Sequence, residues 1–272
     1  MQTALGSAAL LRLKGADALA FAHSQFSRDV LALQPGQYGW SAWLDAQGRA
    51  RSVFALLRTA ADTLMLWWPE GDAGLLATEL RRFVLRSRLV IEALEGWQLL
   101  PCALADLPIG SELAEHLGGW ALRLPDSDTP RGVVLAPMDL ALDPDAQQNR
   151  LRADLMARLP WIAPPTAGLF TPQALELERL GAIAFDKGCY PGQEIVARLH
   201  FRGGNKRGLR VLETGAEACA AGTALIDDTG AIRGSVLYGC APTAKALALA
   251  LAVVSLDAMD RRLRPSSGSP SF

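Results

Sequence analysis

The residues best suited to do chemistry in this chain lie within eight positions, with the sequence KGCYPGQE at residues 187–194. They combine an ammonium, a thiol, a carboxamide and a carboxylate. Pro191 favours the first turn of a helix, so the segment predicts a turn followed by a helix that begins near it. Cys189 would lie just before the helix N-terminus and two residues from Lys187, and both positive charges would favour its thiolate. We therefore predict that Cys189 is the most reactive cysteine, with Lys187 as its neighbour.

Basic residues follow this motif. Glu194 and Arg198 lie four apart on the predicted helix, so they can pair with each other or flank one polar ligand. A Gly-rich turn at 203–205 joins two basic arms. Taken singly, a cysteine near a helix start is usually a buried residue and a basic run is usually a solvated loop. Together they favour a ligand with a heterocycle and several negative charges. All charged side chains from 198 to 210 are basic: Arg198, Arg202, Lys206, Arg207 and Arg210.

The composition excludes several classes of protein. The 272 residues carry 27 Lys and Arg against 28 Asp and Glu, so the net charge of −1 provides no global attraction for nucleic acid or an anionic membrane. The longest apolar run, residues 246–256, is too short to span a bilayer. The N-terminal residues show no secretion signal, so we expect a cytoplasmic protein.

The cysteines and histidines are dispersed, with no C-x-x-C pair and no His at ligand spacing, which argues against a bound metal or a cysteine-ligated cluster. They are Cys102, Cys189, Cys219, Cys240, His23, His116 and His200.

The elements that must position the motif form an α+β pattern. Alternating apolar residues and turn signals predict strands in the first hundred residues, a hairpin around residues 45–48, and two helices. The expected strands are 8–13, 39–44, 51–57, 63–68 and 86–94. The first expected helix starts at residues 15–17, and the second spans 74–85.

The second half is less regular. Only 132–136 is a firm strand before a helix at 147–159, whose leucines lie on one face. Four charged residues of that helix, Arg150, Arg152, Asp154 and Arg158, are expected on its solvated side. A short strand at 182–185 should precede the motif. Short strands at 209–212, 223–227, 231–237 and 246–256 predict a small closed β-barrel or sandwich, followed by a disordered tail at 261–272.

The extended motif resembles a known family. KGCYxGQE is followed by VAR at 196–198 and RGxNKR at 202–207, and this pattern resembles the signature of the YgfZ proteins and their mitochondrial counterparts. Upstream blocks also match: GAD at 15–17, QFSRDV at 25–30 and DxxGR at 45–49. The family's tryptophans are replaced here, by Ala8 before the first strand and by Arg150 in the later helix.

The resemblance implies a fold and a function. The fold would be a three-subdomain ring of the glycine-cleavage T-protein type, with a folate-binding region at 1–205 made of two interleaved α+β subdomains and a C-terminal β-barrel at 206–260. The ligand would be tetrahydrofolate or a one-carbon derivative. The role would be iron–sulfur cluster assembly or repair that supports tRNA-modifying enzymes, with transient contacts to client or assembly proteins and a monomeric state. Neither nucleic acid nor a membrane would be a direct partner.

The resemblance also implies which residues act. Cys189 and Lys187 are carried over as the reactive pair. The residues carried over as folate ligands are Gln25, Asp29, Tyr190, Gln193, Glu194, Arg198 and Arg202. Aminomethyltransferases proper lack the motif cysteine, so that activity, which would require Asp29 or Asp45, is the alternative. An RNA-binding module is a third reading, which the absence of interleaved stacking aromatics disfavours.

Overall fold

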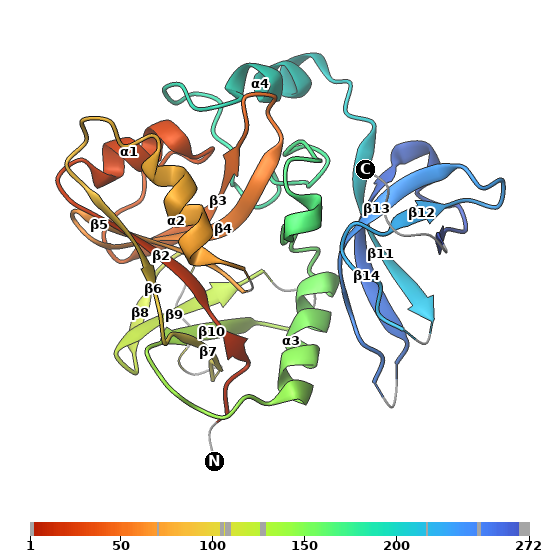
Figure 1. Ribbon diagram of the computed structural model, residues 1–272, viewed down its shortest axis with the longest axis horizontal. Coiled ribbons are helices and arrows are strands. Elements are labelled where there is room, and N and C mark those ends of the chain that lie inside the picture. The colour runs from red at the N-terminus through yellow and green to blue at the C-terminus, as the bar shows by residue number, and fades with distance from the viewer. Residues whose placement is uncertain are drawn as a thin grey trace. The chain divides into compact units, whose positions relative to one another are not determined.

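The computed structural model of the protein describes residues 3–69, 71–103, 106, 110–125, 129–215, 217–243 and 246–266. Within these ranges the chain forms three five-stranded sheets (Figure 1). It divides into two compact units. The first consists of Met1–Trp43, Val53–Gln147 and Gly181–Tyr190, and the second of Leu44–Ser52, Gln148–Leu180 and Pro191–Phe272.

The first sheet is built around a central antiparallel pair. β2 (Ala9–Lys14) pairs with β5 (Thr63–Trp68) from Ala9 opposite Trp68 to Lys14 opposite Thr63. Helix α1 (Ala18–Gln25) packs on β5, and α2 (Ala73–Arg81) packs on β2 and β6, because both helices bury an apolar face. The order of the strands is β3 (Gln37–Leu44), β4 (Ala50–Ala60), β5, β2 and β6 (Val90–Leu94).

The sequence pattern missed four of the five strands of the second sheet, including β8 (Ala114–His116) and β9 (Gly119–Leu124). Their two-residue turn, Leu117 and Gly118, has φ values of 52° and 74°. Such turns normally carry Asn, Asp or Gly at both positions, so a leucine there gives no hairpin signal. The sheet order is β1 (Gly6–Ser7), β7 (Gln98–Pro101), β10 (Arg131–Ala136), β9 and β8.

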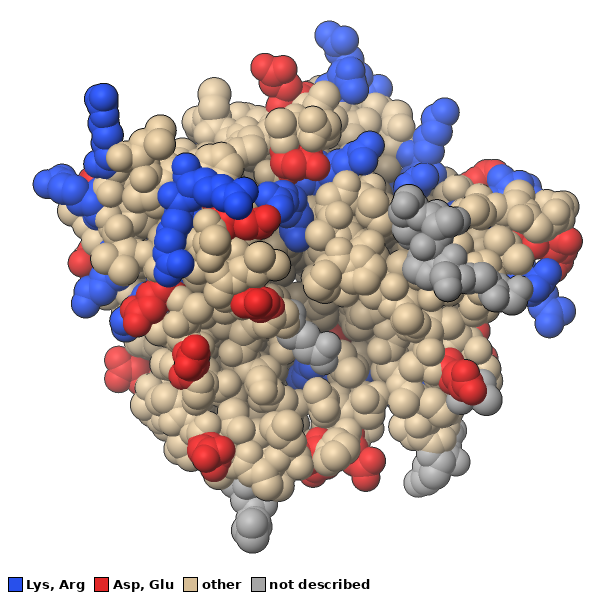
Figure 2. Space-filling model, viewed as in Figure 1, with Lys and Arg blue, Asp and Glu red and all other residues tan. Residues whose placement is uncertain are grey.

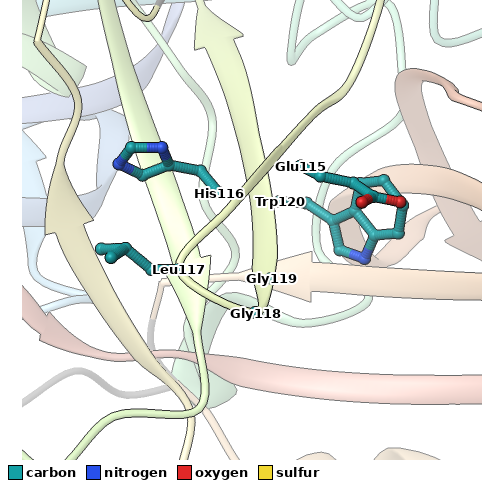
Figure 3. Close-up of a pocket in the computed structure, with 6 residues that line it drawn as sticks. All are labelled: Glu115, His116, Leu117, Gly118, Gly119 and Trp120. Atoms are coloured by element: carbon teal, nitrogen blue, oxygen red, sulfur yellow. The ribbon is translucent and has the colours of Figure 1, made fainter.

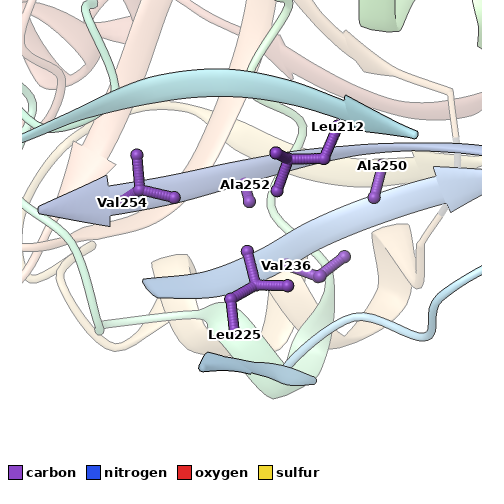
Figure 4. Packing of buried hydrophobic residues seen from close by; sticks show 6 residues of the cluster. All are labelled: Leu212, Leu225, Val236, Ala250, Ala252 and Val254. Carbon is purple, nitrogen blue, oxygen red and sulfur yellow. The ribbon is translucent and has the colours of Figure 1, made fainter. Parts of the chain in front are cut away.

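The third sheet lies in the second unit, and its inner face buries a small apolar cluster (Figure 4). The two ends of its order, β11 and β15, have no pairing with each other within the described residues, so closure into a barrel is not established. β15 pairs with β12, so residues 264–265 are ordered, against the expectation of disorder from 261; residues 267–272 lie outside the described ranges. The order is β11 (Arg207–Gly215), β14 (Ala248–Ser255), β13 (Ile232–Cys240), β12 (Ala224–Ile226) and β15 (Arg264–Pro265).

In helix α3 (Pro144–Met156), two of the charged residues that were expected on a solvated side are buried instead. Arg150 and Asp154 are buried, and the arginine donates to the Asp154 carboxylate at 2.7 Å. The Trp161 indole donates to the same carboxylate oxygen at 3.0 Å. The charges tolerate burial because they neutralise each other and share a third polar partner.

Residues 148–180 lie in the same compact unit as the C-terminal sheet. The region before α4 (Gln193–Arg202) is tied to the C-terminal sheet by hydrogen bonds. Arg152 donates to the carbonyl of Leu247 at 2.6 Å, and the Tyr238 hydroxyl donates to the carbonyl of Leu159 at 2.8 Å. Residues 148–180 therefore belong with the C-terminal sheet. Two short 3₁₀ helices, η2 (Pro164–Thr166) and η3 (Leu256–Ala258), complete the second unit.

None of the helices in the described ranges has the length and apolar content needed to cross a lipid bilayer. The same ranges contain no group of three His, Cys, Asp or Glu side chains arranged as a metal site requires.

Candidate functional site

The motif turn requires a glycine before α4. Gly192 is the N-cap of that helix and has a φ of 76°, in the left-handed region that glycine favours. A Cβ atom at Gly192 would lie 2.4 Å from the Cα of Gly48 and 2.5 Å from the carbonyl oxygen of Asp45. The hairpin block at residues 45–49 and the motif turn therefore contact each other within the second unit.

The hairpin tip holds its shape through Asp45. Its Oδ1 atom accepts from the backbone N–H groups of Gln47 and Arg49, both at 2.9 Å. This carboxylate is therefore occupied by its own turn.

Ser27 links the first half of the motif segment to the chain after α1. Its buried hydroxyl donates to the carbonyl of Ala182 at 2.7 Å and accepts from the amide of Ala42 at 3.0 Å. The Ala184 amide donates to the carbonyl of Ser27 at 2.9 Å. The strand predicted at 182–185 does not form, because this segment makes irregular bonds to one loop instead of joining a sheet.

Lys187 binds the same loop with its ammonium group. Nζ donates to the carbonyl oxygens of His23 at 2.5 Å, Phe26 at 2.5 Å and Arg28 at 2.9 Å. It also lies 4.8 Å from the centroid of the Tyr190 ring. Burial lowers the pKa of Lys187 to about 8, and the charge of Asp29 opposes this shift. Besides its predicted role next to the Cys189 thiol, Lys187 therefore has a structural role, which is to bind the loop after α1.

Asp29 and Gln25 lie in the same loop region. Asp29 Oδ1 accepts from the amides of Leu31 at 3.0 Å and Ala32 at 3.3 Å. It also lies 3.3 Å from Nδ1 of His23, without hydrogen-bond geometry. Burial is the main cause that lowers the pKa of His23, followed by the charge of Lys187. Gln25, the last residue of α1, has a buried Oε1 without a hydrogen-bond partner.

Cys189 and Tyr190 differ sharply in exposure. Cys189 is exposed and lies three residues before the N-cap of α4. The next residue, Tyr190, is buried and its hydroxyl donates to the carbonyl of Ala184 at 3.3 Å. Burial raises the pKa of Tyr190 to about 12, so this phenol stays protonated. The thiol is therefore accessible beside a fixed aromatic ring.

The remaining predicted ligands lie on α4 in the second unit. Glu194, Arg198 and Arg202 are exposed, and Gln193 is half-buried. Glu194 and Arg198 form no ion pair in the structure, so of the two arrangements left open by their spacing the mutual pair is not adopted. The first unit thus holds Gln25, Asp29, Lys187, Cys189 and Tyr190, and the second holds Gln193, Glu194, Arg198 and Arg202.

Sequence reasoning missed three residues of these regions. Ser27 and His23 were not singled out, although Ser27 lies inside the QFSRDV block. Gln173 donates to the carbonyl of Val196 on α4 at 3.1 Å, and its Oε1 is buried without a partner. No local pattern reveals these roles, because each depends on a partner more than 13 residues away.

The first unit also contains a hollow away from the motif. A cavity of about 390 Å³ is lined by the β8–β9 hairpin, with Glu115 and Trp120 to one side of the turn and His116 and Leu117 to the other (Figure 3). It contains none of the predicted site residues.

Comparison with known proteins identifies the family. No protein-family model matches the chain. The tRNA-modifying protein YgfZ of Edwardsiella ictaluri is 33% identical over 235 residues, which cover 76% of this chain and 69% of that protein. The protein of the same name from Klebsiella pneumoniae is 34% identical over 227 residues, covering 75% and 68%. The chain belongs to the YgfZ family. An uncharacterized protein of Haemophilus influenzae is 28% identical over 206 residues, covering 75% and 70%.

The fold of this YgfZ family member is that of the T-protein. The crystal structure of the glycine cleavage system aminomethyltransferase T from Bartonella henselae matches with a TM-score of 0.64 over 94% of this chain and 78% of that one. At 18% identity this likeness concerns the fold alone. The resemblance predicted from the KGCYxGQE motif is thus confirmed for the family and for the T-protein type of fold.

Proposed function

We propose that this protein is a cytoplasmic folate-binding accessory protein of the YgfZ type, which supports iron–sulfur cluster assembly or repair for tRNA-modifying enzymes. One observation carries the proposal most directly. Five predicted site residues, Gln25, Asp29, Lys187, Cys189 and Tyr190, lie in the first unit, where Lys187 binds the motif segment to the loop after α1. The relatives named tRNA-modifying proteins support a link to tRNA modification.

The residues of this region fit a pterin in one specific respect. The buried Oε1 of Gln25 has no partner and is an acceptor, which suits the N–H groups of a pterin ring. Leaving such a group unpaired costs roughly 1–3 kcal/mol, so a ligand that donates to it gains that amount. Tetrahydrofolate when bound would supply a one-carbon carrier, and the exposed Cys189 thiol would lie close to Gln25's loop.

Calorimetric titration with tetrahydrofolate tests this assignment. Gln25→Leu should weaken binding about tenfold, because the ligand then loses its acceptor. Gln47→Leu, at the exposed hairpin tip, is the matched control and should bind like the wild type. Glu194→Ala tests the α4 residues predicted for the same ligand. Wild-type protein that takes up no folate at millimolar concentration would end the proposal.

A genetic complementation experiment tests the role of the Cys189 thiol. A deletion strain should regain activity of its iron–sulfur tRNA-modifying enzymes with the wild-type gene and remain deficient with Cys189→Ala. Complementation by Cys189→Ala equal to the wild type would remove the thiol from the mechanism.

The alternative function is that of an aminomethyltransferase, the activity considered in the sequence analysis. Asp29 or Asp45 would have to orient the amine, and both carboxylates already accept two backbone amides in their own turns. Formation of methylene-tetrahydrofolate from an aminomethylated carrier protein under folate saturation would favour this alternative over the accessory role.

A further inference from the structure

The end of α4 and the loop after it form a surface of unusual character. We call it the α4 basic surface, and it consists of Arg198, Phe201, Arg202, Lys206 and Arg207. All five side chains are exposed, and Phe201 is 73% exposed. The four cations form no ion pair within the described residues. Figure 2 shows Lys and Arg side chains gathered over α4 and the chain that leads to β11.

The exposed phenylalanine contacts the ring of the preceding histidine. The His200 ring packs against it at 84° with 4.8 Å between ring centroids, and His200 Nδ1 lies 3.0 Å from the Glu178 carboxylate. Arg198 and Arg202 lie three residues before and one after Phe201. An aromatic ring that is exposed and flanked by guanidinium groups can act as a stacking platform within a positive field.

The loop after α4 is open to a bulky partner. Gly203 and Gly204 have φ values of 71° and 102°, and both are exposed. A Cβ at Gly203 would meet no atom within 4 Å. The backbone is therefore approachable between the two arginines of α4 and the Lys206–Arg207 pair.

A membrane surface is a poor match for α4. The apolar residues of this ten-residue helix, Ile195, Val196 and Leu199, are buried or half-buried against the protein. Membrane-binding helices present a broad apolar face outward, whereas here one ring is exposed among cations. An acidic protein would use the cations but would not need an exposed planar ring.

We propose that the α4 basic surface binds single-stranded RNA, with phosphates at the four cations and an unstacked base on Phe201. This goes beyond the proposed folate function. It also departs from the expectation of no direct nucleic-acid partner, which relied on the net charge of −1 and on the absence of interleaved stacking aromatics. The exposed Phe201 supplies one such aromatic.

Fluorescence anisotropy of a labelled, unstructured 12-nucleotide RNA with the full-length protein, without folate, tests the proposal. With four phosphate contacts, log affinity should fall with log salt with a slope of about −0.7 × 4, roughly −3. Lys206→Ala/Arg207→Ala should reduce that slope by about half. Arg82→Ala/Arg86→Ala, two exposed arginines of the first unit, is the matched control and should leave the slope unchanged.

Substitutions of Phe201 distinguish binding of RNA from binding of other polyanions. Phe201→Leu keeps an apolar side chain but loses the stacking face, so affinity should fall about fivefold or more, whereas Phe201→Trp should retain it. Circular dichroism and thermal melting verify that each variant is folded.

Four outcomes would overturn the proposal. The first is no RNA binding at low salt, and the second is binding that is equally strong at about 50 and 200 mM salt. The third is equal loss in the Arg82→Ala/Arg86→Ala control. The fourth is displacement of the RNA by polyglutamate, charge for charge, together with an unchanged Phe201→Leu variant, which would assign the surface to an acidic protein. Arg198 and Arg202 are also predicted folate ligands, so folate is left out of the assay and the test variants change other residues.

Discussion

Removal of the Lys187 ammonium should destabilise the protein in a manner that depends on pH. Lys187→Met keeps the aliphatic stem but removes the donor to the carbonyls of His23, Phe26 and Arg28. Each hydrogen bond to a charged group contributes roughly 1.5–3 kcal/mol, and water can reach part of this half-buried site. Relief of the ammonium's desolvation offsets some of the loss. We expect a net decrease in the free energy of unfolding of about 2 kcal/mol at pH 7.

The sign of the pH dependence follows from the pKa. The pKa of Lys187 in the folded protein is about 8, below the ordinary value of 10.5. Between pH 8 and 10.5 the unfolded chain therefore holds a proton that the folded protein has released. Stability from this group rises with pH in that window, by up to about 1.4 kcal/mol per pH unit. The gap in unfolding free energy between wild type and Lys187→Met should widen from pH 8 to 10 and stay constant below pH 8.

Urea unfolding, followed by tryptophan fluorescence and far-UV circular dichroism at pH 7, 8, 9 and 10, measures this gap. Lys14→Met, at the exposed end of β2, is the control and should change stability by less than about 0.5 kcal/mol. A gap that is constant from pH 7 to 10 would refute the shifted pKa. A variant as stable as the wild type at pH 7 would show that the three carbonyl bonds do not hold the loop.

Three further substitutions should separate the structural causes of stability. Gly192→Ala should cost about 3 kcal/mol or more in chemical denaturation, because its Cβ would lie 2.4 Å from a backbone atom. Gly230→Ala, with a φ of 82° and no atom within 4 Å, should cost only about 1 kcal/mol. Asp154→Ala should lower the free energy of unfolding by about 3–5 kcal/mol, because it leaves the buried Arg150 charge and the Trp161 indole without this acceptor.

Each of these substitutions has a control position elsewhere in the chain. Equal costs at Gly192 and Gly230 would mean that φ alone, and not the contact with the hairpin tip, decides the effect. The exposed pair of Arg12 and Glu92 is the control for Asp154, and Glu92→Ala should cost at most about 1 kcal/mol. A similarly small cost for Asp154→Ala would contradict the view that its carboxylate neutralises a buried charge.

Most strands could be predicted because their signal is local. The apolar run at residues 63–68 gave β5 with its observed bounds, and the strands of the C-terminal sheet lie where turn residues separate apolar runs. Failures occurred where the local signal was absent or misleading. The Leu117–Gly118 turn lacks turn residues, and 182–185 is apolar because it packs on the loop after α1 and not because it joins a sheet.

The sequence by itself determined the family, through a motif long enough to be specific, and the start of a helix near Pro191. Only the tertiary structure decided what the side chains of these segments contact. It brought Lys187 to carbonyls about 160 residues away, buried Arg150 and Asp154 together, and left Phe201 exposed. The physical reason is that periodicity sets the local backbone, whereas the partner of a charge or a ring depends on which distant segments pack against it.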